Sequence, residues 1–259
     1  MSATFESLRP AFTTAIGMVT PSANVVVERV TTAILADFPK VSAHFSRTPV
    51  FGSLDLFPEG YDWEGMLGAA RLLAQAQPDV IAWNGSKGGM LGLSVDQEFC
   101  RKVADETGIR ATTSTVALYH ALDTIDTRRV AIVSPYMPEY QQKLVAAFTH
   151  AGFDVVADAC SQIGDNLAFA VASDASIADM VYRVADAKPD AILTWCTNFP
   201  AAFTVAKLEN EVGIPILDSV TLAVWHALQL TGHHETAARR WGQLFETADR
   251  HNLPVVGNP

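Results

Sequence analysis

The sequence has few basic residues for its length. Lys and Arg number 18 against 28 Asp and Glu, which gives a formal net charge of −10. Nucleic acids and anionic membrane surfaces are bound through basic protein surfaces, so this balance argues against both as partners. An anionic small molecule is not excluded, because a local site depends only on the groups that line it.

Cysteine is also scarce. Cys100, Cys160 and Cys196 are odd in number and far apart, which favours reduced thiols over a disulfide framework. The chain has no CxxC or HExxH motif, and the adjacent His233 and His234 are poorly placed to converge on one ion. We therefore expect no metal site.

Long hydrophobic runs are missing as well. None approaches the roughly 20 residues that cross a bilayer, and the start, MSATFE, lacks the basic and apolar segments of a secretion signal. We expect a cytoplasmic protein. Its 259 residues are 49% hydrophobic and 18% charged, which is enough apolar material for one large core or two linked ones.

What the sequence does contain is a regular alternation of strand and helix patterns. Strands are expected at 14–19, 41–45, 79–84, 109–112, 129–134, 153–158, 190–195 and 214–217. Between them, apolar residues recur at intervals of three and four, which predicts helices at 25–37, 63–77, 95–107, 139–151, 177–187 and 201–212. This order predicts an α/β fold of parallel sheets covered by helices.

Several helix ends are marked by residue chemistry. Gly108, Gly152 and Gly213 each follow a helical pattern, where a left-handed residue closes a helix. Ser173 or Ser176 is expected to cap the start of the helix that follows.

Landmarks of the first half return in the second half in the same order. The run 16–21, IGMVTP, resembles 130–135, VAIVSP, and segment 106–115 resembles 211–221. QPDVIAWNGS at 77–86 resembles KPDAILTWCT at 188–197, so Gly85 occupies the position of Cys196. One thiol stands where a symmetric site would have two.

The repeat predicts two pseudo-symmetric lobes, each with a four-stranded, mainly parallel sheet flanked by helices. We expect the first lobe at 14–120 and the second at 126–217, with segment 218–246 packing back on the first. Ligands of open α/β sheets collect at the carboxyl ends of the strands, beside helix N-termini that favour anions. The active site is therefore expected between the lobes.

The predicted strand ends are rich in small hydroxyl and amide side chains. They lie at 20–24, 84–86, 112–115, 134–136, 194–198 and 218–219. Apart from Lys87 and Asp218, they carry almost no charge. Such an edge can bind carboxylates through many neutral donors.

These residues carry a family resemblance that runs from about 16 to 246. Segment 17–28, GMVTPSANVVVE, is similar to the start of maleate cis-trans isomerases. The segments 112–115, 128–136 and 218–225 are closely similar to arylmalonate decarboxylases. Both groups belong to the aspartate/glutamate racemase superfamily.

The resemblance implies a chemistry for Cys196. Racemases of the superfamily place one cysteine from each lobe on opposite faces of an acidic carbon, and maleate isomerases also use two. Glycine at position 85 disfavours both reactions. Arylmalonate decarboxylases have glycine there and keep the second cysteine, which protonates the enediolate left by loss of CO₂. The resemblance thus implies a cofactor-independent lyase that acts on a small malonate-type or related carboxylate. Gly85→Cys should then introduce racemase activity.

The same resemblance implies the substrate-binding residues. Ser86 and Tyr136 correspond to the hydroxyls of the family's oxyanion cage, and Gly85 and Thr197 adjoin them in our predicted set. Lys87 departs from the family, which has serine there. A cation at this position either strengthens carboxylate binding or points to solvent.

Two asparagines complete the predicted site. Asn24 and Asn166 match residues that bind substrate carboxylates in maleate isomerases, and they suggest a small polar diacid. Each has a structural interpretation: Asn24 as a helix cap and Asn166 as a turn former. Cys100 and Cys160 match no catalytic position and are expected to be packing residues.

Two alternatives to the decarboxylase stay open. One is a maleate isomerase-like or racemase-like enzyme that uses Cys196 alone. The other is a non-catalytic protein that keeps a degenerate site to bind a carboxylate. The sequence leaves open whether the chain forms a homo-oligomer.

Overall fold

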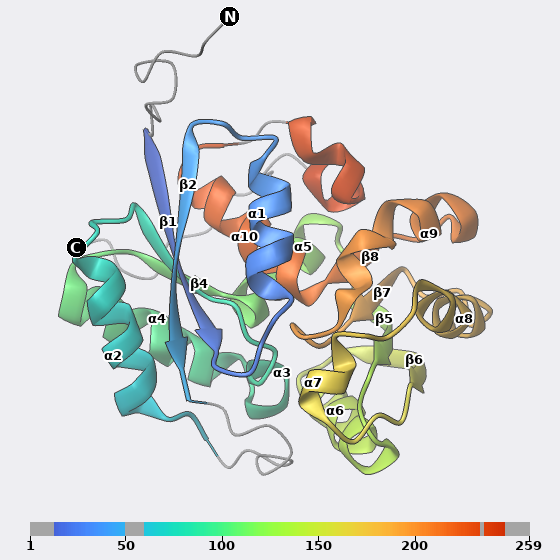
Figure 1. Ribbon diagram of the computed structural model, residues 1–259. Coiled ribbons are helices and arrows are strands. Elements are labelled where there is room, and N and C mark those ends of the chain that lie inside the picture. Colours follow the sequence, from blue (N-terminus) through green and yellow to red (C-terminus); the bar gives the residue numbers. More distant parts are fainter. Residues whose placement is uncertain (1–12, 50–59, 234–235, 247–259) are drawn as a thin grey trace, which may run out of the picture.

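The computed structural model describes residues 13–49, 60–233 and 236–246. Its strands form two four-stranded sheets in which all neighbouring strands are parallel (Figure 1). The first sheet contains β1 (Thr14–Pro21), β2 (Val41–Thr48), β3 (Val80–Trp83) and β4 (Ala111–Thr113). The second contains β5 (Arg129–Ser134), β6 (Asp154–Cys160), β7 (Ala191–Thr194) and β8 (Ile216–Asp218).

The two sheets have the same strand order. It is β2-β1-β3-β4 in the first and β6-β5-β7-β8 in the second. Each strand of the first half thus has a counterpart four strands later, as the internal repeat predicts. The predicted α/β fold of two lobes is confirmed.

Helices flank both sheets. They are α1 (Val27–Leu35), α2 (Trp63–Ala74), α3 (Gly88–Leu91), α4 (Leu93–Thr107), α5 (Ser114–Thr124), α6 (Pro138–His150), α7 (Asn166–Phe169), α8 (Asp174–Ala185), α9 (Val205–Val212) and α10 (Ser219–Leu230). The described residues also form the 3₁₀ helices η3 (Pro200–Phe203), η4 (Thr236–Trp241) and η5 (Gln243–Glu246). The helix expected at 201–212 is therefore two pieces, η3 and α9. The predicted ranges did not include α3, α5, α7 or α10.

The predicted helix ends are confirmed. Gly108, Gly152 and Gly213 have φ angles of 70°, 91° and 69°, the left-handed values that glycine tolerates best. The Ser173 side chain accepts a hydrogen bond from the backbone N–H of Ser176 and so caps α8.

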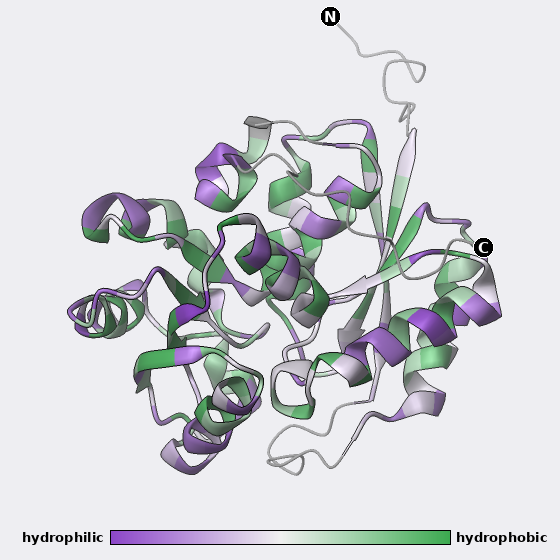
Figure 2. Ribbon diagram, turned by 180° about the vertical axis from the view of Figure 1, so that it is seen from behind, coloured by the Kyte–Doolittle hydropathy of each residue, from purple (hydrophilic) through white to green (hydrophobic). Residues whose placement is uncertain are grey.

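The lobes share an inner hydrophobic core. It joins residues of β1 and β3 to residues of β5 and β7, while separate clusters lie beneath α2 and α4 in the first lobe and beneath α8 and α9 in the second. In Figure 2, hydrophilic and hydrophobic residues alternate along the outer helices, as expected for helices with one face on a core. No helix within the described ranges is long and apolar enough to span a membrane.

The C-terminal part of the chain contacts both lobes. Helix α10 follows β8 of the second sheet but packs against α1, α5 and β3, and it is buried from Ser219 to Leu228. Beyond it, Arg240 forms an ion pair with Asp37 of the first lobe at 2.9 Å. The backbone N–H of Gln243 donates to Glu209 of the second lobe at 2.8 Å.

Candidate active site

Two hydrogen bonds join the loop that follows β3 to the loops that follow β5 and β7. The hydroxyls of Ser86 and Tyr136 lie 3.2 Å apart, and either one can donate. The Trp195 indole N–H donates to the Ser86 carbonyl oxygen at 2.9 Å. Ser86 belongs to the first lobe and the other two residues to the second, so these contacts cross the junction between the lobes.

Cys196 lies at this junction, directly after β7 and Trp195. Its side chain is buried, with 4% exposed. Burial raises the pKa of the Cys196 thiol to about 12, against smaller lowering effects of the Asn198 backbone N–H and the Tyr136 hydroxyl. The thiol therefore holds its proton at neutral pH and is a poor nucleophile in the resting protein.

Tyr136 is protonated for the same reason. Burial raises the pKa of its phenol well above the usual value, and the neighbouring Cys196 raises it further. The phenol can therefore donate a hydrogen bond at neutral pH. Its ring packs against Tyr140 and Phe169, with centroid distances of 4.4 and 5.6 Å, which fixes its orientation.

Asn24 connects the first lobe to the loop that carries Cys196. Its side-chain oxygen accepts hydrogen bonds from the backbone N–H groups of Val26 and Val27, both at 2.9 Å, at the start of α1. Its side-chain nitrogen donates to the Thr197 hydroxyl at 3.2 Å. The helix-capping interpretation of Asn24 is therefore correct, and the amide also reaches across the junction.

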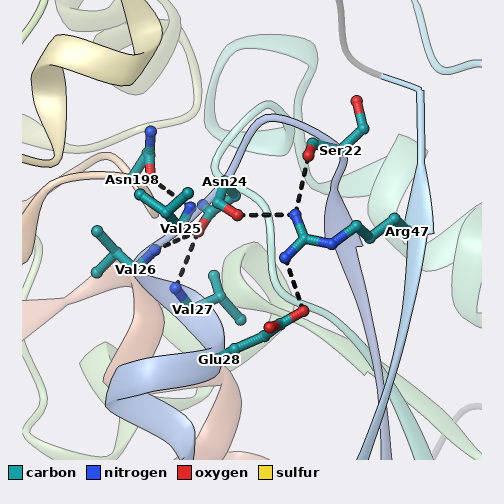
Figure 3. Close-up of polar contacts among 8 residues, drawn as sticks. All are labelled: Ser22, Asn24, Val25, Val26, Val27, Glu28, Arg47 and Asn198. Carbon is teal, nitrogen blue, oxygen red and sulfur yellow. Dashed lines mark hydrogen bonds and ion pairs between the residues drawn. The ribbon is translucent and has the colours of Figure 1, made fainter.

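A second contact across the junction lies beside the first. The Val25 backbone N–H donates to the Asn198 side-chain oxygen at 2.9 Å (Figure 3). The Asn198 amide nitrogen in turn donates to the backbone oxygen of Asn166 at 2.6 Å. Asn166, the first residue of α7, thus joins the cluster through its main chain.

Arg47 anchors the loop that carries Asn24. Its guanidinium donates to the carbonyl oxygens of Ser22 and Asn24, both at 2.8 Å, and pairs with Glu28 at 2.8 Å (Figure 3). One planar cation therefore ties the end of β2 to both ends of the turn and to α1. We infer that Arg47 holds the turn in the shape that lets Asn24 reach Thr197.

Replacing Arg47 by Ala should lower the free energy of unfolding by about 1–2 kcal/mol. Two charge-assisted hydrogen bonds to carbonyl groups are lost, whereas the half-exposed pair with Glu28 contributes little. Chemical denaturation measures the change. Arg101→Ala is the matched control, because the ion pairs of Arg101 with Glu98 and Asp105 are exposed and lie within α4. Their loss should cost less than about 0.5 kcal/mol. Equal losses in both variants would contradict an anchoring role.

Gly85, the counterpart of Cys196 in the first lobe, lies against an indole. A Cβ atom built on Gly85 would lie 2.2 Å from the Trp83 ring. The Trp83 indole N–H donates to the Tyr61 hydroxyl at 3.1 Å, and that hydroxyl donates to Asp96 at 2.8 Å. The Gly85→Cys substitution that the resemblance suggests would bring the new side chain against this ring.

Asp96 is a buried carboxyl with no exposed surface. Burial raises its pKa to about 6, against lowering hydrogen bonds that include the one from Tyr61. A carboxyl whose pKa is higher in the folded than in the unfolded state stabilises the fold least when it is ionised. Its contribution therefore falls as the pH rises from about 4 to about 6.

Asp96→Asn should remove this pH dependence. A pKa of about 6 in place of 3.8 corresponds to about 3 kcal/mol, so the unfolding free energy of the variant should gain about that much relative to the unaltered protein between pH 4 and 7. Urea denaturation of both proteins across this range gives the difference between their unfolding free energies. The contributions of the other titrating groups are the same in both proteins and cancel in this difference. Asp105→Asn, on the exposed side of α4, is the control. A difference that stays constant with pH would show that Asp96 is not the group responsible.

Asp218 is the second buried carboxyl near the junction. It caps α10 by accepting from the backbone N–H groups of Val220 and Thr221, and it accepts from the Thr194 hydroxyl at 2.9 Å. Burial raises its pKa to about 6. Its charge also contributes to the raised pKa of Cys196.

Direct contacts bring together some of the predicted site residues, in two groups. Ser86, Tyr136 and Cys196 form one group, and Asn24 and Thr197 form another beside it. Lys87 is half-buried immediately before α3.

The other predicted candidates lie elsewhere. Cys100 is buried in the core beneath α4, and Cys160 is half-buried at the end of β6. His233 contacts Thr14, whereas His234 lies outside the described residues. Among the residues described, no three His, Cys, Asp or Glu side chains gather where they could hold a metal ion.

Sequence reasoning missed Arg47, Asn198 and the pair formed by Tyr61 and Asp96. Asn198 could have been found, because it follows Cys196 and Thr197 in the same loop. Arg47 was hidden because the second strand was expected to end at residue 45, whereas β2 continues to Thr48.

Two parallel sheets that meet beside a buried thiol define an α/β protein of two lobes with its site at their junction. The model of the arylmalonate decarboxylase family matches residues 16–245, and the chain belongs to this family. Over 246 residues the chain is 26% identical to arylmalonate decarboxylase from Bordetella bronchiseptica. The alignment covers 92% of this chain and 99% of that protein.

Maleate isomerases are also similar. The enzyme from Nocardia farcinica is 26% identical over 226 residues, which is 83% of this chain and 88% of that protein. A solved structure of a mutant of maleate cis-trans isomerase from this organism, with a covalently bound succinylcysteine intermediate, superposes with a TM-score of 0.80 at 25% identity. The superposition covers 91% of this chain and 99% of the isomerase chain. The resemblance to the group of arylmalonate decarboxylases and maleate isomerases is confirmed.

Proposed function

We propose that the protein is a cofactor-independent decarboxylase of small malonate-type carboxylates, in which Cys196 protonates the intermediate. One observation carries the proposal. A buried, protonated thiol approaches the junction from the second lobe, while the corresponding position of the first lobe is Gly85. A site with one proton donor can protonate a carbanion, but it cannot remove a proton from one face and return it to the other.

The neutral donors around Cys196 suit such a reaction. When the bond between the α-carbon and the departing carboxylate breaks, its electron pair enters the remaining carboxylate and gives an enediolate, while CO₂ leaves. The hydroxyls of Ser86 and Tyr136 can hydrogen-bond to this developing charge, and preorganised donors of this kind are worth several kcal/mol each. The S–H proton of Cys196 then passes to the α-carbon, and the thiolate regains a proton from solvent.

The raised pKa of Cys196 favours donation over nucleophilic attack. A thiol with a pKa of about 12 is almost fully protonated at neutral pH, which a proton donor requires. A cysteine that adds to a double bond reacts as the thiolate. The donor role therefore fits this buried thiol better than the covalent role does.

A maleate isomerase-like reaction with Cys196 alone is the second candidate. It is favoured by Asn24, whose amide reaches Thr197 beside the thiol, and by the similarity to maleate isomerases. A racemase-like reaction would need a second acid or base on the side of Gly85. A carboxylate-binding protein without activity is the remaining outcome to be tested.

The proposal extends to the partner, the location and the other binding residues. A small carboxylate is the proposed partner, without cofactor, nucleic acid or membrane, and the proposed location is the cytoplasm. Asn24, Asn166, Lys87 and Thr197 are proposed to bind the carboxylate that is retained. A homo-oligomer is left open.

The reaction can be identified with a panel of substrates. We expect CO₂ release from phenylmalonate or methylmalonate, and no loss of the ultraviolet absorbance of maleate. Cys196→Ala should lower the rate about 10²–10⁴-fold, because the proton donor is lost. Cys160→Ala is the control and should keep full activity. Unchanged turnover in Cys196→Ala would exclude the donor role. Consumption of maleate without CO₂ would identify an isomerase, and carboxylate binding without turnover would identify a binding protein.

The pH dependence of the rate gives an independent test. Because the pKa of Cys196 is about 12 and that of Tyr136 is also raised, kcat should stay level from about pH 7 to about pH 10. It should fall only above that range, as the donors ionise. Initial rates of CO₂ release across the range measure the profile. A fall centred near pH 8 or 9, the range of an ordinary thiol, would contradict a protonated Cys196 as donor.

A further inference from the structure

The two halves of the chain differ by a paired change of size beside the site. In the repeat, the first half has Trp83 and Gly85 where the second half has Thr194 and Cys196. The large Trp83 thus precedes Gly85, which has no side chain, whereas the small Thr194 precedes the thiol of Cys196. The two positions are separated by one residue in each half, so their side chains can compete for the same space.

In the first lobe this space is taken. A Cβ atom on Gly85 would lie 2.2, 2.4 and 2.8 Å from the Cζ2, Cε2 and Cη2 atoms of Trp83. Real Cβ atoms essentially never approach another heavy atom within 3.0 Å. Any residue other than glycine therefore requires either the indole or the loop to move.

The indole is held in place. Trp83 is 1% exposed, and its N–H donates to Tyr61, whose hydroxyl donates to Asp96. The ring also packs edge-on against Tyr61, with the centroids 6.0 Å apart. A buried, hydrogen-bonded ring has no vacant direction in which to turn.

The loop is held as well. A Cβ on Gly88 would lie only 1.8 Å from an Asp96 oxygen, which shows how closely the backbone after Gly85 packs on this carboxyl. Asp96 therefore contacts both the loop backbone and, through Tyr61, the indole. Neither side of the contact between Trp83 and Gly85 is free to give way.

The second lobe shows the opposite arrangement. Thr194 is small, and its hydroxyl donates to Asp218 at 2.9 Å. Cys196 follows two residues later without a clash that would exclude its side chain, and its sulfur reaches Tyr136. In the half of the chain that carries the cysteine, the residue two positions before it is therefore a threonine and not a tryptophan.

We propose that Trp83 is a specificity-determining residue that excludes a thiol from the first lobe and so restricts protonation to the side of Cys196. The inference rests on the proposed function for its catalytic part. It follows that Gly85→Cys alone does not create a two-thiol site. The exchange of both residues, Trp83→Thr with Gly85→Cys, copies the second lobe and should create one.

A cycle of four proteins tests the steric part without any substrate. Thermal unfolding is measured for the unaltered protein, Gly85→Ala, Trp83→Thr and the double variant. Gly85→Ala should lower Tm by several degrees beside Trp83 and by less than about 1 degree beside Thr, because contacting residues are coupled. Gly68→Ala in α2 is the control, since its Cβ meets nothing closer than 3.8 Å and should leave Tm unchanged or raised. Trp83→Leu replaces Trp83→Thr if the latter does not fold. Equal losses in both backgrounds would overturn the proposal.

Hydrogen exchange tests the catalytic part. Enantiopure 2-phenylpropionate in D₂O is followed for deuterium at the α-carbon. Only Trp83→Thr with Gly85→Cys should exchange and racemise it, at a rate at least about 10-fold above either single variant. Exchange by Gly85→Cys alone, or none by a folded double variant, would overturn the role of Trp83. If the unaltered protein releases no CO₂ from malonates, the proposed function fails by itself, whereas the unfolding cycle still decides the steric claim.

Discussion

The hydrogen bond between Ser86 and Tyr136 is the contact on which the arrangement of the site depends. It joins the carboxyl ends of β3 and β5, and therefore the two lobes, at the point where the sulfur of Cys196 lies. The bonds from Asn24 to Thr197 and from Val25 to Asn198 secure the same junction from the β1 side. A site assembled in this way has its parts fixed by the relative position of two rigid sheets rather than by one flexible loop.

Burial gives the junction its chemical character. It keeps a proton on Cys196 and on Tyr136 at neutral pH, because a charged form would lose hydration that the surroundings do not replace. The same effect raises the pKa of Asp218 and Asp96, the two carboxyls that brace the neighbouring loops. The thiol and the phenol next to each other are thus neutral donors, suited to a substrate that brings its own negative charge.

Periodicity and the internal repeat were enough to predict the two sheets, their parallel strands and the asymmetry between Gly85 and Cys196. These features are local or follow from comparing one half with the other. The contacts across the junction could not be predicted from the sequence. Neither the periodicity nor the repeat places Asn24 beside Thr197, which lies 173 positions later. Arg47 was missed because the second strand was predicted too short. Trp83 was not singled out as a site residue, because hydropathy does not show the direction in which a side chain points.

Helix α10 follows the last strand of the second sheet but packs with the first lobe. Its counterpart α5 packs against α10 and against β4 and α4 of its own lobe, and its Tyr119 ring contacts Phe153 of the second lobe with a centroid distance of 5.1 Å. A polypeptide of half this length, built on the same plan, would leave the face of its final helix that packs on the other lobe uncovered unless another copy covered it. Joining two such units in one chain keeps the two final helices packed on each other at any protein concentration.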